Sequence, residues 1–126
     1  MLDLNTTINS TSHKNATLDY LSSTMLHEIV HIVHNTIERN NIGYNKKGYS
    51  YFREALACAL GNKDFHKVIP MDISLNELTS GKVYNYDYYY TLGKYIIDNI
   101  PHEKVLEYVK NPSLLDDDIK DIYDKL

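Results

Sequence analysis

The segment His27-Glu28-Ile29-Val30-His31 reads H-E-x-x-H and lies in a stretch with helical periodicity. On an α-helix, positions i and i+4 share one face, so the imidazoles of His27 and His31 can reach one metal ion. Glu28 stands beside them, where its carboxylate can take a proton from a water molecule that the metal activates. The motif therefore predicts two metal ligands and a general base.

Apolar residues surround the motif at helical spacing. Thr17 is a suitable N-cap and the sequence Asn40-Asn41-Ile42-Gly43 favours a helix end, which predicts a first helix over residues 18–40. The residues expected to form a dry shell around the histidines are Met25, Leu26, Ile29, Val30, Ile32 and Val33. Burying two imidazoles and a carboxylate is costly unless something satisfies them, which favours a metal site over a chance pattern.

A third ligand is needed, because a catalytic zinc ion usually has three protein ligands and one open position. Glu54 is the candidate, on a second helix predicted over residues 49–60. The intervening chain is long enough to end one helix, turn, and bring a second helix against the first. Ala55, Ala57 and Ala59 would let these helices approach closely. The alternative is that Glu54 is exposed and paired with a lysine, as surface carboxylates usually are.

The remaining chain predicts further helices and little else. Ser74 can cap a short helix that ends at Leu78, and Glu77 stands at the reciprocal capping-box position. Further helices are expected over residues 86–99, 102–110 and 113–125, and the last has an acidic first turn. Residues 1–16 are polar and predict a flexible arm or a short strand. We expect a mainly α fold, α+β at most, with one domain over residues 17–126 and a small or absent sheet.

Composition restricts the classes of partner. The net charge of −4, from 13 basic and 17 acidic residues, argues against nucleic acid and against an anionic membrane surface. The single cysteine rules out an internal disulfide, and no apolar run approaches the ~20 residues of a membrane span. The expected localisation is cytoplasmic for the sequence as written; an excised domain of a larger or exported protein is the alternative. Oligomeric state is left open.

The motif together with Glu54 and the small residues after it resembles the gluzincin branch of zinc metallopeptidases, which includes thermolysin-like enzymes and related aminopeptidases. The block Glu54-Ala55-Leu56-Ala57 is similar to the E-G/A-x-A element of the second zinc-binding helix in short bacterial peptidase domains of that clan. Residues 73–78, 90–97 and 102–106 resemble the short element and the closing helical pair of those domains. The likeness covers about residues 20–110 and implies a zincin-like helical core with an active-site helix, a second metal-binding helix and C-terminal helices.

This resemblance implies a hydrolase that cuts a peptide or protein substrate with Zn²⁺ as its cofactor. His27, His31 and Glu54 would be the metal ligands. Glu28 would activate water and later deliver a proton to the leaving amine. Tyr90, in a Y-x-x-G pattern, would stabilise the oxyanion of the tetrahedral intermediate, with Tyr86 as the alternative one turn earlier.

Three features depart from the family. The segment before the first helix is too short for the multi-stranded sheet on which these enzymes usually lay out a peptide. Cys58 occupies the position where the thermolysin pattern has an Asp, four residues after the third ligand, so the orientation of a metal-bound histidine is in question. No second half closes a cleft.

The other candidate residues receive simpler interpretations. His34 shares the face of His27, but a rise of about 5.4 Å per turn separates the two too far to share one ion, so we expect a residue outside the metal shell or in a cleft. His66 and His102 are expected to face solvent, and Cys58 to be a buried apolar residue.

Three functions compete with a general metallopeptidase. One is a non-catalytic, zinc-stabilised regulatory or binding module. Another is a peptidase dedicated to one regulatory protein, and the last is a helical protein without a metal.

Overall fold

The structure is a computed structural model that describes residues 14–42, 48–61 and 63–126. Its α-helices are α2 (Lys14–Ile42), α3 (Ser50–Leu60), α4 (Leu75–Thr79), α5 (Asp87–Asn99), α6 (His102–Lys110) and α7 (Leu115–Asp124). Two 3₁₀ turns, η1 (Lys63–Phe65) and η2 (Pro112–Leu114), complete the order. Within these ranges there is no strand, so the expected mainly α fold is confirmed.

The first helix begins earlier than predicted. Thr17 lies inside α2 rather than at its N-cap, and residues 14–16 are helical rather than part of an arm or strand. A threonine in a helix interior lowers helix stability by less than ~1 kcal/mol relative to alanine. A suitable capping residue therefore does not fix the start of a helix when the residues before it can also adopt helical backbone. The rest of the predicted arm, residues 1–13, lies outside the described residues.

The later helices follow the sequence pattern closely. Ser74 caps α4, with its Oγ accepting a hydrogen bond from the Glu77 backbone N–H at 3.1 Å. The acidic run 116–118 occupies the first turn of α7, where carboxylates interact favourably with the helix dipole. The predicted helix over 113–125 is divided, because η2 forms its first turn and α7 the remainder.

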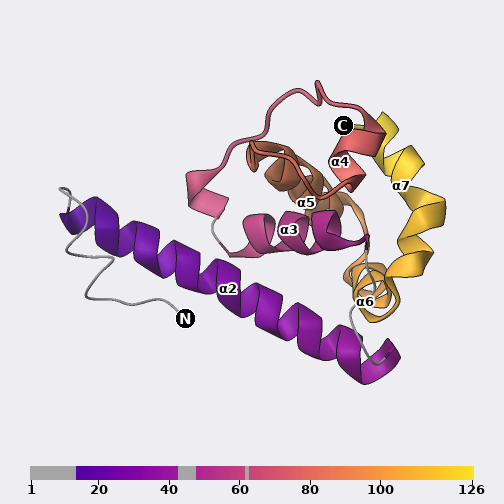
Figure 1. Cartoon of the computed structure of the whole chain (residues 1–126), viewed down its shortest axis with the longest axis horizontal. Coiled ribbons are helices and arrows are strands. Elements are labelled where there is room, and N and C mark those ends of the chain that lie inside the picture. The colour runs from indigo at the N-terminus through magenta and orange to yellow at the C-terminus, as the bar shows by residue number, and fades with distance from the viewer. Residues whose placement is uncertain (1–13, 43–47, 62) are drawn as a thin grey trace.

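Figure 1 shows α2 as a long helix lying along one side of a bundle formed by the other elements, with α3 next to it and α5 behind α3. The contact between α3 and α5 is very close, since a Cβ added to Gly93 would lie 2.0 Å from the Ala55 carbonyl oxygen. The same added Cβ would lie 3.0 Å from the Ala59 Cβ. Ala55 and Ala59 therefore lie at the contact with α5, and that they also let α2 approach stays a prediction.

The core lies between α3 and the C-terminal helices, and contributions come from every helix after α2. Its buried residues are Tyr51, Phe52, Ala55, Leu56, Cys58, Leu78, Tyr89, Leu92, Ile96, Val105, Tyr108, Val109, Leu115, Ile119 and Ile122. Val30 and Ile37 of α2 pack against this core from outside. None of the helices in the described ranges is both long and apolar enough to cross a membrane.

Candidate metal centre

The three predicted ligands meet between α2 and α3. The two imidazole Nε2 atoms of His27 and His31 lie 3.0 Å apart. Glu54 faces both rings, with Oε2 at 3.2 Å from His27 Nε2 and Oε1 at 3.0 Å from His31 Nε2. These are the only three residues in the described part of the chain whose His, Cys, Asp or Glu ligand atoms gather closely enough to hold one ion. The alternative of a lysine-paired surface Glu54 does not fit this placement.

The spacing of these atoms suits a zinc ion. Bonds of 2.0–2.1 Å in a tetrahedral arrangement put neighbouring ligand atoms about 3.3 Å apart. The separations of 3.0–3.2 Å in the structure are within a few tenths of an ångström of that value. Two imidazole nitrogens and a carboxylate are also the donor set that zinc accepts in catalytic sites.

The centre is partly shielded from water. The side chains of His27, His31 and Glu54 are 10%, 18% and 23% exposed. Burial alone would raise the pKa of Glu54, but hydrogen bonds and charge interactions with the two histidines outweigh it and lower the pKa to about 2. Glu54 is therefore an anionic carboxylate at neutral pH, as a metal ligand must be.

The apolar residues around the motif do not form the expected dry shell. Ile29, Ile32 and Val33 are 48%, 64% and 52% exposed, and Met25 and Leu26 are exposed as well. Ile29 and Val33 line an apolar groove between α2, α3, α5 and α6 instead of enclosing the histidines. Val30 alone among the predicted shell packs against the core. The histidines are shielded instead by α3, because their own face of α2 lies against that helix.

Gly61, directly after α3, permits the close approach of the two ligand-bearing helices. A Cβ added at Gly61 would lie 2.5 Å from His27 Cα and 2.6 Å from its backbone nitrogen. Real Cβ atoms do not come this close to backbone atoms, so no larger residue fits without moving α2. Gly61 is the C-cap of α3, and the structure gives it in addition a packing role beside a candidate ligand.

Cys58 stands one turn after Glu54 and is fully buried, as predicted. Burial raises the pKa of its thiol, and a hydrogen bond between Cys58 and His27 acts in the opposite direction. Cys58 thus contacts a candidate ligand from the position at which the thermolysin pattern has an Asp. A neutral thiol is a weaker hydrogen-bond partner than a carboxylate, so it orients the imidazole less firmly.

Of the predicted catalytic residues, Glu28 lies on α2 and the two tyrosines lie at the start of α5. Glu28 is exposed and directly follows His27 in α2. Tyr90 is half-buried on α5, with its ring stacked on that of His66 at a centroid distance of 5.8 Å. Tyr86 lies just before α5, and its pKa is raised by burial and then by the negative charge of Glu54. Tyr86 is therefore within electrostatic reach of the candidate ligand Glu54.

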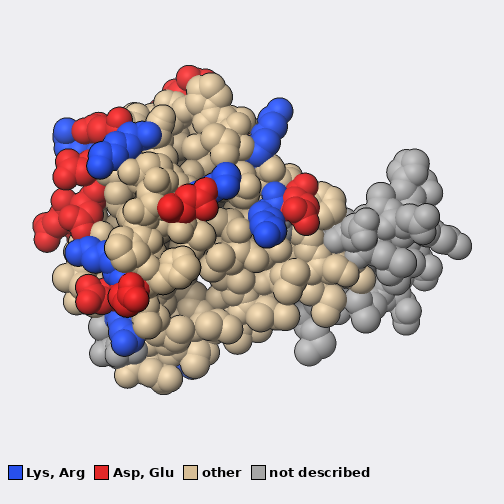
Figure 2. Space-filling model, turned by 180° about the vertical axis from the view of Figure 1, so that it is seen from behind, with Lys and Arg blue, Asp and Glu red and all other residues tan. Residues whose placement is uncertain are grey.

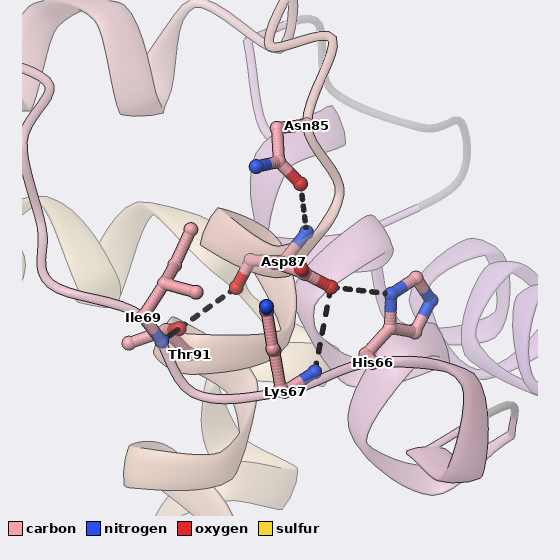
Figure 3. Close-up of polar contacts among 6 residues, drawn as sticks. All are labelled: His66, Lys67, Ile69, Asn85, Asp87 and Thr91. Atoms are coloured by element: carbon pink, nitrogen blue, oxygen red, sulfur yellow. Dashed lines mark hydrogen bonds and ion pairs between the residues drawn. The ribbon is translucent and has the colours of Figure 1, made fainter.

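A polar cluster that the sequence did not predict lies at the start of α5 (Figure 3). His66 Nδ1 is 3.1 Å from Asp87 Oδ1, and the Ile69 backbone N–H donates to Thr91 Oγ1 at 3.0 Å. The expectation that His66 faces solvent is wrong, since its side chain is only 12% exposed. These contacts hold the connector 66–69 on α5. The acidic first turn at Asp87 was visible in the sequence, but nothing in the pattern indicated its partner.

This cluster is linked electrostatically to Cys58, one turn after the candidate ligand Glu54. The pKa of the Cys58 thiol is raised by burial and, to a smaller extent, by the charges of both Glu54 and Asp87. Cys58 is therefore within electrostatic reach of both groups. Of the other histidines, His102 is exposed as predicted and His34 is buried on the α3-facing side of α2.

Comparison with known proteins gives no relative for this arrangement: no protein-family model, no curated protein and no solved structure matches the chain.

Proposed function

We propose that the chain is a zinc-dependent metallopeptidase that hydrolyses peptide bonds. The observation that carries the proposal is the convergence of two imidazole nitrogens and both oxygens of one carboxylate within 3.0–3.2 Å, from two different helices. His27 and His31 come from one H-E-x-x-H helix, in which Glu28 directly follows a candidate ligand, so its carboxylate would be near an ion held there. Helix α3 then supplies Glu54 as the third ligand.

Each residue has a separate task in this proposal. When bound, the zinc ion supplies Lewis-acid activation of a water molecule. Glu28 accepts a proton from that water and returns it to the leaving amine, a role for which an exposed carboxylate next to the ligands is suited. Tyr90 or Tyr86 donates a phenolic hydrogen bond to the developing oxyanion.

A second candidate function keeps the metal without the catalysis: a zinc-stabilised regulatory or binding module. Two observations favour it. The described residues contain no strand on which a peptide substrate could be laid out. The ligands also join α2 to α3, so an ion there would tie a long and largely exposed helix to the bundle.

The test combines metal analysis with peptide cleavage. Protein purified without added zinc is assayed for bound metal, then incubated with an unbiased peptide mixture whose products are identified by mass spectrometry. The key variant is Glu28→Gln, which removes the base and leaves the three ligands intact. The matched control is Glu103→Gln, which makes the same change at an exposed position on α6.

The proposal expects about one zinc ion per chain, cleavage by wild type and Glu103→Gln, and a loss of at least 100-fold in Glu28→Gln with zinc retained. Zinc at full occupancy without cleavage of any peptide would favour the binding module. Cleavage by Glu28→Gln at the wild-type rate would contradict the assigned mechanism, and absence of metal would remove both functions.

A further inference from the structure

An apolar groove separate from the three candidate ligands lies between α2, α3 and the helices α5 and α6. It has a volume of about 440 Å³. Apolar side chains make up most of its wall, and its only polar lining residues are His34 and His102. Several wall residues are strongly exposed, among them Ile29, Val33 and Leu60 at 48–52%. Figure 2 shows charged side chains at the left, at the top and across the middle of one face, with a broad uncharged area below them.

His34 is the unusual member of this wall. It is only 3% exposed, yet neither of its ring nitrogens has a hydrogen-bond partner among the described residues. The nearest carboxylate oxygen, Glu38 Oε2, is 3.9 Å from His34 Nε2, which is beyond hydrogen-bond distance. Glu38 is itself engaged by two hydrogen bonds from Arg53, at 2.7 and 2.8 Å.

A buried imidazole without partners costs free energy, so its presence at the wall of a hollow needs a reason. Burial, with smaller contributions from the charges of Arg53 and His31, lowers the pKa of His34 to about 4. The ring is therefore neutral at physiological pH and offers one N–H donor and one nitrogen acceptor. Volume, apolar walls and one or two orienting polar groups are the features of small-molecule sites in proteins.

We propose that this groove binds a small, uncharged and mostly apolar molecule that carries one hydroxyl or carbonyl group, with that group hydrogen-bonded to His34. The ligand is uncharged because the wall contains no Lys, Arg, Asp or Glu, and because the buried Glu38 carboxylate lies close behind His34. A small molecule fits better than an apolar helix of a second copy, since such a helix would cover the groove and leave the imidazole without a partner. This proposal is independent of peptidase activity.

The test uses 1-octanol as the probe, an uncharged chain with one hydroxyl group. Binding is followed by the methyl NMR shifts of groove residues such as Val30, Leu56 and Val105. Val33→Lys places a charge at an exposed position of the groove wall, and Ile32→Lys is the matched control, because Ile32 neighbours it on α2, is 64% exposed and does not line the groove. Thermal unfolding of both variants verifies that they fold.

The expected result is saturable binding of 1-octanol to wild type and Ile32→Lys, with affinity at least tenfold lower in Val33→Lys. Octanoate, which brings a charge to the same place, is expected to bind at least tenfold more weakly than octanol. His34→Leu should weaken octanol about fivefold by removing one hydrogen bond. Equal binding by the two lysine variants, or octanoate binding as tightly as octanol, would overturn the proposal. A dimer that only Val33→Lys dissociates would overturn it too, since a second copy would then cover the groove.

Discussion

Arg53 donates two hydrogen bonds to the carboxylate of Glu38, at 2.7 and 2.8 Å, and so links α3 to α2 one residue before the candidate ligand Glu54. Glu38 is fully buried and the Arg53 side chain is 12% exposed. A charge-assisted pair of this kind is strong when complete and costly when one member is missing. It holds the C-terminal half of α2 against α3, while His27 and His31 lie two to three turns earlier on the same face.

Replacing Glu38 by Ala is expected to lower the free energy of unfolding by about 3–5 kcal/mol, because it removes the carboxylate that pairs with the largely buried Arg53 charge. Chemical denaturation measures this loss. The matched control is the double variant Glu38→Met with Arg53→Met, in which no charge remains, and its stability should return to within ~1–2 kcal/mol of wild type. Equal losses in the single and double variants would mean that packing rather than charge dominates the site.

His34 predicts a pH dependence of stability. Its pKa is lowered from 6.5 to about 4 in the folded chain, chiefly by burial, so the unfolded chain binds the proton more readily. The stabilising contribution is therefore complete above pH 6.5 and disappears as the pH falls towards 4, with a total of about 3 kcal/mol. Urea denaturation of the metal-free protein between pH 7.5 and 4 measures the curve.

His34→Leu provides the control for this pH dependence, because leucine does not titrate and suits the apolar surroundings. Subtracting its curve removes the contributions of His27, His31 and the carboxylates. The difference between the two proteins should change by about 3 kcal/mol across this range. Parallel curves would show that His34 is accessible to protons in the folded state.

The helices could be predicted because their determinants are local. Ser74 with Glu77, the acidic run 116–118 and the apolar spacing of α5 and α6 all act within one or two turns, and each lies where it was expected. The start of α2 was missed for the opposite reason: several residues tolerate either state, so Thr17 had no decisive local preference. Which face of a helix becomes buried depends on how the other helices pack and not on the local sequence. The exposed Ile29, Ile32 and Val33 show this.

The convergence of His27, His31 and Glu54 could be predicted because helix geometry sets the His27–His31 pair and the spacing along the chain allows Glu54 to reach it from a second helix. The pairing of His66 with Asp87 could not, since it joins a connector to a helix start 21 residues later. Only the packing of α3 on α5 determines that contact. The sequence likewise does not indicate that Gly61 lies against His27, because glycine is common directly after a helix for local reasons alone.

Gly61→Ala is expected to weaken zinc binding by about tenfold and to cost about 1–3 kcal/mol of stability, because the added methyl group must displace the His27 backbone. Zinc affinity is measured by competition with a metal indicator, and stability by denaturation. Gly48→Ala is the control, since its added methyl group meets nothing within 4 Å and its cost comes from the backbone φ of +95°, before the start of α3. It should lose stability but keep its zinc affinity; equal loss of affinity in both would point to a general loosening of the bundle.

Zinc is expected to stabilise the folded chain. At a free concentration 1,000 times the dissociation constant, binding to the folded state alone adds about 4 kcal/mol, which a chelator should remove. Glu54→Gln should lose most of this gain, whereas Glu77→Gln, an exposed carboxylate on α4, should keep it. Thermal unfolding with zinc and with chelator measures the difference. An unchanged response in Glu54→Gln would exclude that residue as a ligand.

The choice between Tyr90 and Tyr86 can be made by removing one hydroxyl at a time. Tyr90→Phe is expected to lower kcat by about 10² without changing zinc affinity, if the phenol stabilises the oxyanion. Tyr90 is held against His66, whose other partner is Asp87, so its ring position is fixed by packing that phenylalanine preserves. Tyr86→Phe serves as the comparison, because Tyr86 responds to the charge of Glu54 and is the more exposed of the two. If only Tyr86→Phe loses activity, the oxyanion role belongs to Tyr86. If neither variant loses activity, the hydrogen bond to the oxyanion must come from another donor.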